Sequence, residues 1–290
     1  MVNQTQSCIP TRTQAGPFLK WAGGKSSLLK QYAPFFPQHR VRTYFEPFVG
    51  SGAVFFHLRG TGRAGSAHLS DINRELINLY RVVRDFPEEL IEALQHHKRH
   101  HSRWYYYYMR QQDREPGWRQ QAGSVERAAR LLYLNKTCYN GLWRVNRRGE
   151  FNVPMGRYNN PRILDEARLR AAARALAPAR LSAASFDEAV DLAGPGDFVY
   201  FDPPYVPLSA TSSFTAYTAN GFGPDAQRRL AGVFRALDRR GVSVMLSNSD
   251  HPLVYELYRG FRIERVEARR HINSQGDGRG AISEVVVLNY

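Results

Sequence analysis

The residues whose types and spacing most directly indicate chemistry are Asp202-Pro203-Pro204-Tyr205, which follow the apolar run 197–201. The exocyclic N6 amine of adenine is a poor nucleophile because its lone pair is delocalised into the ring. A carboxylate and a fixed backbone carbonyl that accept its two N–H bonds would free that lone pair. Proline fixes φ and has no N–H donor, which keeps the carbonyls aimed inward, and Tyr205 can stack on a flipped base. The alternative is a plain Asp-Pro turn after a buried strand.

A glycine-bearing segment, residues 48–52, follows a second expected strand. Gly50 and Gly52 allow a sharp turn and a close approach of a ligand to the start of a helix. Asp71 ends the next strand, where a carboxylate suits a ribose diol. The third glycine of the dinucleotide fingerprint is missing, so a nucleoside without phosphates, such as S-adenosylmethionine, fits better than a pyrophosphate. A tight turn without function is the alternative.

Residues 18–26 end in Gly-Lys-Ser, as a phosphate-binding loop does, but Leu19 stands where that loop requires glycine. A nucleotide hydrolase is therefore a poor interpretation. Trp21, flanked by Lys20 and Lys25, instead suits an aromatic-lined pocket in which a sulfonium gains cation–π attraction. The alternative is an ordinary buried tryptophan.

Residues 139–158 combine aromatic side chains, arginines, asparagines and glycines. Such a loop can fill the space left by a flipped base, read guanine with two hydrogen bonds, and hold phosphates. Its composition alone is equally compatible with an exposed loop.

The charge of the chain indicates a polyanionic partner. Lys and Arg number 40 against 26 Asp and Glu among 290 residues, which gives a net charge of +14. Residues 98–148 hold 12 basic and 3 acidic residues, so this stretch supplies +9 of that total. Clustered positive charge favours phosphate contacts and counterion release, whereas a solubilising surface mixes both signs.

The elements that must position these residues read as strands alternating with helices. Short apolar runs lie at 42–46, 67–70, 197–201 and 242–247, and segments 261–267 and 282–289 predict a closing hairpin. The alternation predicts an α/β fold with a mostly parallel central sheet covered on both faces. Ligands of such sheets bind beyond the carboxyl ends of the strands, which is where the segments above lie.

Residues 86–161 break this alternation and predict an inserted, mainly helical domain. A helical pattern at 125–134 places Ala128, Leu131 and Leu132 on one face. The expected organisation is a loose tail over 1–16, a catalytic domain over 17–85 and 162–290, and the insertion between them. Two cysteines allow no disulfide framework or four-ligand zinc site, and no apolar run approaches a membrane span, so we expect an intracellular protein.

Taken together, these motifs resemble the Dam family of DNA adenine methyltransferases, over residues 17–290. Residues 18–25 are similar to its first cofactor motif, 45–52 to its glycine motif and 202–205 to its catalytic motif. Residues 139–158 resemble the recognition hairpin of members that target GATC, and 208–217 the loop beside their target-base pocket. The motif order is that of the D12 class, in which the recognition domain lies between the glycine and catalytic motifs.

The resemblance implies a Rossmann-like methyltransferase that uses S-adenosylmethionine and double-stranded DNA, with the following roles. Residues expected around the cofactor are Trp21, Lys25, Phe48, Gly50, Ser51, Gly52, Asp71, Phe186 and Asp202. Residues expected to contact DNA are Lys20 and Arg144 at guanines, Tyr139 and Asn140 at the space of the flipped adenine, Leu142 and Pro154 at neighbouring bases, and Arg157 at phosphate. The polar tail before Pro17 and a basic loop at 271–280, with Arg279 as a candidate phosphate contact, depart from the family.

We therefore expect direct methyl transfer to adenine N6, without a metal or a covalent enzyme intermediate, by a monomer that needs no protein partner. The expected setting is the cytoplasm of a prokaryotic or phage-infected cell, in restriction–modification or DNA replication. Two alternatives stay open from the residues. One is methylation of another planar nitrogen, such as cytosine N4 or an RNA base, and the other is a DNA-binding module that has lost turnover.

Overall fold

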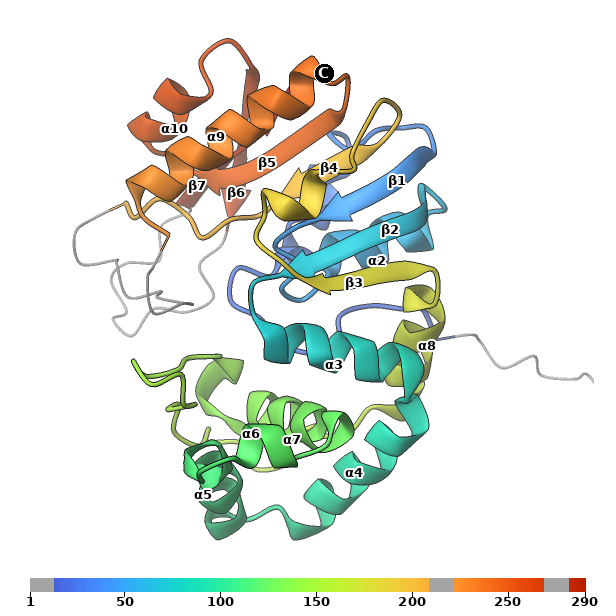
Figure 1. The fold of residues 1–290 in the computed structure, drawn as a ribbon, viewed down its shortest axis with the longest axis vertical. Coiled ribbons are helices and arrows are strands. Elements are labelled where there is room, and N and C mark those ends of the chain that lie inside the picture. The colour runs from blue at the N-terminus through green and yellow to red at the C-terminus, as the bar shows by residue number, and fades with distance from the viewer. Residues whose placement is uncertain (1–12, 209–221, 269–281) are drawn as a thin grey trace, which may run out of the picture.

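The computed structural model describes residues 13–208, 222–268 and 282–290. Its centre is a seven-stranded sheet with the order β3-β2-β1-β4-β5-β7-β6. The strands are β1 (Val41–Glu46), β2 (Ala64–Asp71), β3 (Ala179–Ala183), β4 (Phe198–Phe201), β5 (Ser243–Ser249), β6 (Arg262–Ala268) and β7 (Ile282–Leu288). The first five are parallel, and β7 lies antiparallel between β5 and β6. Figure 1 shows the sheet running through the upper part of the molecule.

The expected α/β class and the closing pair of strands are both confirmed by this topology. The edge strand β3 was not expected from the sequence. Its five residues, Ala-Arg-Leu-Ser-Ala, bury only Ala179 and Leu181, so the apolar signal is too short to stand out. Its pairing with β2 places the chain after it, which includes Phe186, beside the cofactor motifs.

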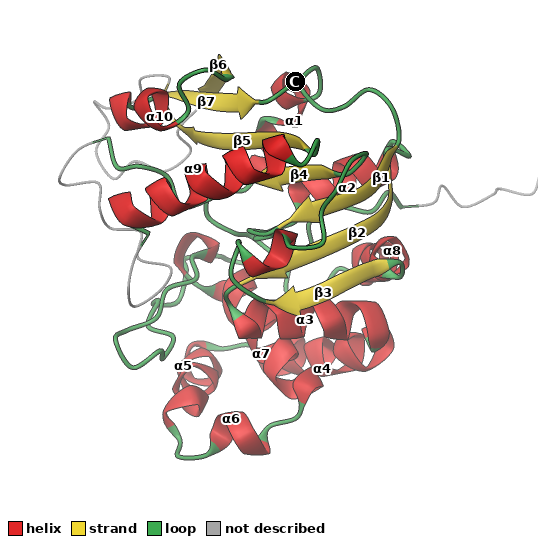
Figure 2. Cartoon of the chain, turned by 45° about the horizontal axis from the view of Figure 1, so that its top comes forward, coloured by secondary structure: helices red, strands yellow, loops and turns green. Residues whose placement is uncertain are grey.

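Helices cover both faces of the sheet, as Figure 2 shows. On one face, α9 (Pro224–Arg239) and α10 (Pro252–Leu257) pack on Phe45 and Phe201. On the other, α1 (Leu29–Tyr32), α2 (Ala53–Gly60) and α8 (Glu166–Leu176) belong to a second core that includes Tyr44 and Tyr200. Adjacent residues of one strand thus enter opposite cores, because successive side chains of a strand point to opposite faces.

Four of the helices between β2 and β3 form a layer of their own. It contains α4 (Pro87–His100), α5 (Arg103–Gln111), α6 (Trp118–Gln121) and α7 (Ser124–Thr137), which lie below α3 (Arg74–Asp85) in Figure 1. Ala128, Leu131 and Leu132 of α7 are buried, as the helical pattern predicted. Because α7 packs on α3 and α4 in the same core as α2, the layer is firmly joined to the sheet. The domain boundaries at 86 and 161 stay predictions.

Local sequence explains how the elements start. Asn73 caps α3, since its side-chain oxygen accepts hydrogen bonds from the backbone N–H groups of Glu75 and Leu76, at 3.1 and 3.2 Å. The beginning of β4 is fastened to β1 by Asp197, which accepts two hydrogen bonds from Arg42, at 2.9 and 2.7 Å. Among the described helices, none is both long and apolar enough to cross a bilayer.

Candidate active site

A cavity of about 330 Å³ opens at the carboxyl ends of β1, β2 and β4. Its lining residues are 21–25, Glu46, 48–51, Ala53, Val54, 71–73, 202–205 and Phe222. The four segments that the sequence singled out for cofactor and base chemistry therefore meet in one place. The position agrees with the rule that parallel sheets bind ligands at this edge.

Asp202 follows β4 and is held from two sides. Its Oδ1 lies 2.7 Å from Nζ of the buried Lys25 and accepts a hydrogen bond of 2.8 Å from the hydroxyl of Ser247 on β5. Ser247 is in turn 2.9 Å from the hydroxyl of Tyr200. Both named contacts use Oδ1, and a charged and a neutral donor fix the orientation of the carboxylate.

The two prolines after Asp202 present their carbonyls differently. The carbonyl of Pro204 accepts a hydrogen bond of 2.9 Å from the side-chain amide of Gln227 on α9. The expectation that the proline carbonyls point inward together is therefore wrong for Pro204. No donor among the described residues bonds the carbonyl of Pro203, which leaves this acceptor next to Asp202 available for a ligand.

Tyr205 is fixed at its hydroxyl. It donates a hydrogen bond of 2.7 Å to Glu284 on β7, and the same carboxylate oxygen accepts another of 3.1 Å from Tyr32. The ring of Tyr205 lies 4.8 Å from Nζ of Lys25. Burial, together with the charges of Asp202 and Glu284, raises the pKa of Tyr205 well above its usual value, so the phenol stays a neutral donor.

The glycine turn requires its glycines. Gly50 has φ +46° and Gly52 has φ +66°, a left-handed region that other residues avoid. A Cβ on Gly50 would approach Trp21 to 2.9 Å, and one on Gly52 would approach the Tyr80 hydroxyl to 2.7 Å. Tyr80 donates a hydrogen bond of 3.0 Å to the Gly50 carbonyl, which locks the turn. Gly52 shapes the turn without lining the cavity.

Asp71 stands at the end of β2 and faces the same turn. It accepts hydrogen bonds from the backbone N–H groups of Asn73, at 3.0 Å, and Gly50, at 3.4 Å. Desolvation raises the pKa of Asp71 to about 6, while these two N–H groups act in the opposite direction. A desolvated carboxylate of this kind is a good acceptor for the hydroxyls of a ribose.

Glu46 is a cavity residue that the sequence analysis did not assign. It ends β1, is only 3% exposed, and its Oε2 has no hydrogen-bond partner among the described residues. Burial raises its pKa to about 8. The signal was available, because an acidic residue at the carboxyl end of an apolar strand, directly before a glycine turn, is unusual.

Phe48 and Phe222 form an aromatic part of the cavity lining. Phe48 stacks on Phe186, with ring centroids 5.6 Å apart and planes at 25°. Phe186 itself is buried and does not line the cavity. Its contact with a ligand would therefore run through Phe48, which is less direct than the sequence analysis expected.

Residues 139–158, which we call the hairpin, are tied together by isolated antiparallel bridges between Cys138 and Met155 and between Val145 and Phe151. Tyr139 is 48% exposed at its start. Asn140 has φ +55°, a left-handed backbone that Asn tolerates better than most residues. The hairpin thus presents Tyr139 and Asn140 to solvent at a sharp turn.

Lys20 is attached to the hairpin by Asn135 of α7, a residue that the sequence analysis missed. The buried Asn135 amide accepts a hydrogen bond from the backbone N–H of Lys20, at 2.9 Å, and donates to the carbonyls of Lys20 and Gly141, at 2.7 and 3.0 Å. The Lys20 ammonium lies 5.0 Å from the ring centroid of Tyr158. The structure therefore brings Lys20 beside both ends of the hairpin.

The other four expected DNA contacts are spread along the hairpin. Arg144, Pro154 and Arg157 are exposed and Leu142 is half-buried. Nε of Arg144 donates a hydrogen bond of 2.8 Å to the side chain of Asn152 on the opposite arm. This contact orients the guanidinium group and leaves its two terminal nitrogens without a hydrogen bond to any described residue.

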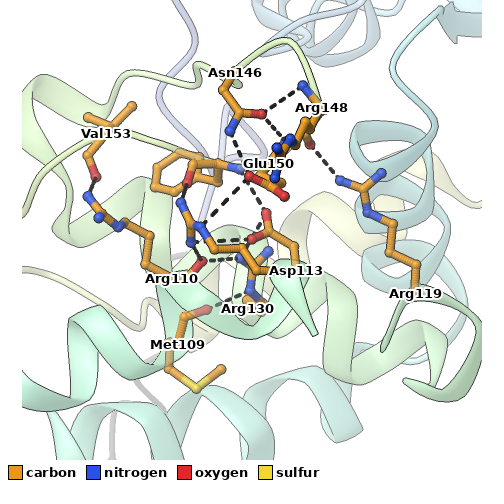
Figure 3. Close-up of polar contacts among 12 residues, drawn as sticks. Met109, Arg110, Asp113, Arg119, Arg130, Asn146, Arg148, Glu150 and Val153 are labelled. Carbon is orange, nitrogen blue, oxygen red and sulfur yellow. Dashed lines mark hydrogen bonds and ion pairs between the residues drawn. The ribbon is translucent and has the colours of Figure 1, made fainter. Parts of the chain in front are cut away.

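A polar network under the hairpin, drawn in Figure 3, fixes it to the helices. Asp113 accepts a hydrogen bond of 2.8 Å from the backbone N–H of Phe151 and pairs with Arg130 of α7 at 3.1 Å. Arg130 also donates to the carbonyls of Met109 and Arg110, at 2.7 and 2.9 Å. Both charged side chains are buried, and Oδ1 of Asp113 has no hydrogen-bond partner among the described residues, although it lies 3.7 Å from the Arg114 guanidinium group.

The family profile of the D12 class of N6 adenine-specific DNA methyltransferases matches residues 21–272. The chain belongs to that family. It is an adenine-specific DNA methyltransferase, and DNA is its substrate. The cavity with Asp202 at its edge is thus the candidate active site of a known class of enzyme.

Relatives from two bacteria and an archaeon align over nearly the full chain. The Type II methyltransferase M1.LlaDCHI of Lactococcus lactis is 46% identical, covering 94% of this chain and 95% of its own. The Type II methyltransferase M.MjaIII of Methanocaldococcus jannaschii is 42% identical, covering 94% and 99%. The DNA adenine methylase of Escherichia coli K12 is 37% identical, covering 93% and 94%.

The methyltransferase takes its methyl group from S-adenosylmethionine, the cofactor of the D12 class. The residues of the cavity fit this molecule. Gly50 leaves room that a side chain would fill, and Asp71 would offer an acceptor for the ribose. Oε2 of Glu46, which has no hydrogen-bond partner among the described residues, would offer an acceptor for a cationic group. Lys25 supplies a positive charge for a carboxylate, and Trp21 and Phe48 supply flat apolar walls.

Three further expectations lie partly or wholly outside the described residues. The loop 208–217 falls in the undescribed range 209–221 except for Leu208, and the basic loop with Arg279 falls in 269–281. Residues 1–12 of the expected tail over 1–16 are not described either. Within the described ranges, no group of three or more His, Cys, Asp or Glu side chains forms a metal site. Cys138 is buried, and burial raises its pKa to about 12, so it is a poor nucleophile.

Glu46→Gln is expected to make the protein without cofactor more stable at pH 8 than the wild type. Because the folded-state pKa is about 8 against about 4.5 when unfolded, the folded protein keeps a proton that the unfolded chain releases. The stability that this proton contributes is present below pH 4.5 and is lost as the pH rises toward 8, by a few kcal/mol. Urea unfolding of both proteins at pH 5 and pH 8 measures the difference. Equal pH dependence of the two proteins would contradict the assignment.

Proposed function

We propose that this methyltransferase acts on a flipped adenine within GATC in double-stranded DNA, with Asp202 and Pro203 as the groups that engage the N6 amine. The observation that carries the proposal is the position of Asp202, held by Lys25 and Ser247 at the edge of the cavity beside the Pro203 carbonyl, which accepts no hydrogen bond from the described residues. The GATC target rests on the resemblance of the hairpin to that of GATC-targeting members. A GATC duplex is therefore the first substrate to test.

In the proposed direct transfer, Asp202 and Pro203 make the N6 amine more nucleophilic. Oδ2 of Asp202 and the Pro203 carbonyl accept its two N–H bonds, which draws the nitrogen away from conjugation with the ring. The Tyr205 ring, held at its hydroxyl by Glu284, supports the base by stacking. When bound in the cavity, S-adenosylmethionine would supply an electrophilic methyl group, with the C–S bond broken and its electron pair left on sulfur as the bond to N6 is made. The surplus proton on N6 passes to Asp202 and then to solvent.

We assign the cofactor to Trp21, Lys25, Glu46, Phe48, Gly50 and Asp71, with Phe186 behind Phe48. The Lys25 ammonium, 2.7 Å from Oδ1 of Asp202, would also offer a positive charge to a cofactor carboxylate, while Oδ2 would accept from the amine. The DNA side is assigned to Lys20 and the hairpin, and the helical layer over 86–161 to target recognition. A monomer working in a prokaryotic cytoplasm, where its DNA substrate lies, is the simplest form of this proposal.

The test is cofactor-dependent methylation of two duplexes, one with GATC and one with that site scrambled, followed by nucleoside analysis. N6-methyladenine in the GATC duplex alone is the expected result. Methylation of both duplexes would remove the proposed target but keep the chemistry. The absence of N6-methyladenine in both, with bound cofactor, would remove the target and the assigned substrate form.

Arg144→Ala is expected to relax selection at one guanine by about 1–3 kcal/mol, because a guanidinium that makes two hydrogen bonds to guanine is lost. Because the hydrogen bond to Asn152 already orients the Arg144 guanidinium group in the free protein, DNA binding does not have to order it. The measurement is the ratio of methylation rates on GATC and on duplexes with one base pair changed.

Arg157→Ala is the matched control, since Arg157 is also an exposed hairpin arginine but is assigned to phosphate. It should weaken binding to all duplexes similarly and lower the slope of log affinity against log salt by about 1. If Arg144→Ala also weakened all duplexes equally, its assignment as a base reader would be wrong.

A further inference from the structure

Trp143 is a residue of the hairpin that has no role in the proposal above, and it packs against a residue of the cavity lining. Its ring stacks on that of Trp21, with centroids 6.2 Å apart and planes at 20°. Trp21 lines the cavity, whereas Trp143 does not and instead lines a neighbouring hollow of about 230 Å³. Among the described contacts, the stacking on Trp21 is the direct aromatic contact between Trp143 and the cavity lining.

Trp21 is confined from its other side as well. Its ring edge comes so near Gly50 that a Cβ there would lie 2.9 Å away, and its carbonyl accepts a hydrogen bond of 3.1 Å from the Gly24 N–H. The position of the indole is thus set by the glycine turn on one side and by Trp143 on the other. Removing Trp143 would leave a half-buried ring with freedom to turn away from the cavity.

Within the hairpin, Trp143 is held in place by contact with Phe151. It packs on the buried Phe151, at 5.0 Å between ring centroids. The backbone of Phe151 is bonded to Asp113, which the buried Arg130 holds in place, as Figure 3 shows for the two charged residues. Because Trp143 packs on this fixed part of the hairpin, a displacement of the hairpin would displace Trp143 as well.

The hairpin borders the cofactor side at a second place. The hollow beside Trp143 is also lined by Val145 and Gly149 of the hairpin and by Ile72 and Asn73. Ile72 and Asn73 line the cavity too, and they directly follow Asp71. Two segments that line the cofactor cavity therefore lie next to the hairpin. Trp21 contacts Trp143, and Ile72 and Asn73 line the hollow that Val145 and Gly149 also line.

We propose that Trp143 is a positioning residue that fixes Trp21 and thereby couples the cofactor cavity to the hairpin. This rests on the proposed roles of the cavity and the hairpin. Because the two share Trp143, a ligand that orders one lowers the cost of ordering the other. The effect is reciprocal: bound cofactor tightens specific DNA binding by the same factor by which specific DNA tightens cofactor binding.

The experiment uses the full chain with Trp143→Ala, the conservative Trp143→Phe, and Trp104→Ala as the matched control. Trp104 is 73% exposed on α5 and stacks only on Tyr108 among its described aromatic neighbours. Calorimetry measures the Kd of S-adenosylhomocysteine without DNA. The Kd of a GATC duplex is then measured without and with saturating S-adenosylhomocysteine, and the ratio of the two values is the coupling factor.

Trp143→Ala should weaken S-adenosylhomocysteine about threefold to tenfold, the scale of one aromatic pair, and bring the coupling factor close to one. Trp143→Phe should restore part of both effects, which loss of folding alone would not produce. A Trp143→Ala protein that matches Trp104→Ala in both readouts would overturn the proposal, as would a wild-type coupling factor of one. If Trp21→Ala had no effect on the Kd of S-adenosylhomocysteine, the coupling through Trp21 would also be overturned, whereas a wild type that bound no S-adenosylhomocysteine would remove the proposed cofactor site instead.

Discussion

Replacing Asp202 by asparagine is expected to slow methyl transfer about 10²- to 10⁴-fold, the range for losing a group that handles protons in the reaction. Asparagine keeps the shape of the side chain and one acceptor oxygen, but it loses the negative charge. The asparagine side chain can also direct an N–H group toward the N6 amine, although the amine requires an acceptor at that position. Single-turnover methylation of a GATC duplex measures the loss.

Ser247→Ala is the matched comparison, because it removes the hydrogen bond to Oδ1 and leaves the carboxylate and its contact with Lys25. It should cost far less activity than the change at Asp202. Calorimetry with S-adenosylhomocysteine shows whether the Asp202→Asn cavity still binds cofactor. Activity within tenfold of the wild type in Asp202→Asn would remove the residue from its assigned role.

Lys25→Met is expected to lower the free energy of unfolding by about 3 kcal/mol, since a buried pair is broken and the partner stays charged. Lys25 is 3% exposed and also donates a hydrogen bond of 2.6 Å to the Gly23 carbonyl, so its ammonium is surrounded by acceptors. Methionine fills a similar volume, which limits any cavity effect. The figure is the lower end of the range for such pairs, because the Asp202 side chain keeps some contact with solvent.

The double variant Lys25→Met/Asp202→Asn separates charge from packing. Once the carboxylate is gone, the missing ammonium should matter less, so the double variant should be more stable than the sum of the single losses implies. Urea unfolding of the four proteins provides this cycle. Strictly additive losses would mean that the 2.7 Å contact contributes nothing as an ion pair.

Sequence reasoning located the main parts of the site because their signals are local. The motif at Asp202 and the turn at Gly50 follow apolar strands directly, and the carboxyl ends of parallel strands meet at one edge. Family resemblance added Phe186, which the structure places behind Phe48 rather than on the cavity surface. Glu46 was overlooked although its place at the end of an apolar strand, directly before the glycine turn, was a local signal for it.

The residues that escaped prediction act through contacts that only the folded chain creates. Asn135 bonds Lys20 from far along the sequence, and Trp143 meets Trp21 across a similar separation. Their neighbours in the sequence give no sign of these partners. The short strand β3 was missed for a related reason, since its place is set by pairing with β2 rather than by its own composition.

The order in which the chain is synthesised differs from the order of strands across the sheet. β7 is made after β6 but lies between β5 and β6, and it carries Glu284, the support of Tyr205. A nascent chain that has not yet delivered β7 therefore leaves β5 with an open edge and β6 without its partner. Because Tyr205 lacks the support of Glu284 until β7 has paired, we expect activity only after β7 joins the sheet. Until then, the open edge of β5 is the place at which incomplete chains are expected to associate or to be captured by chaperones.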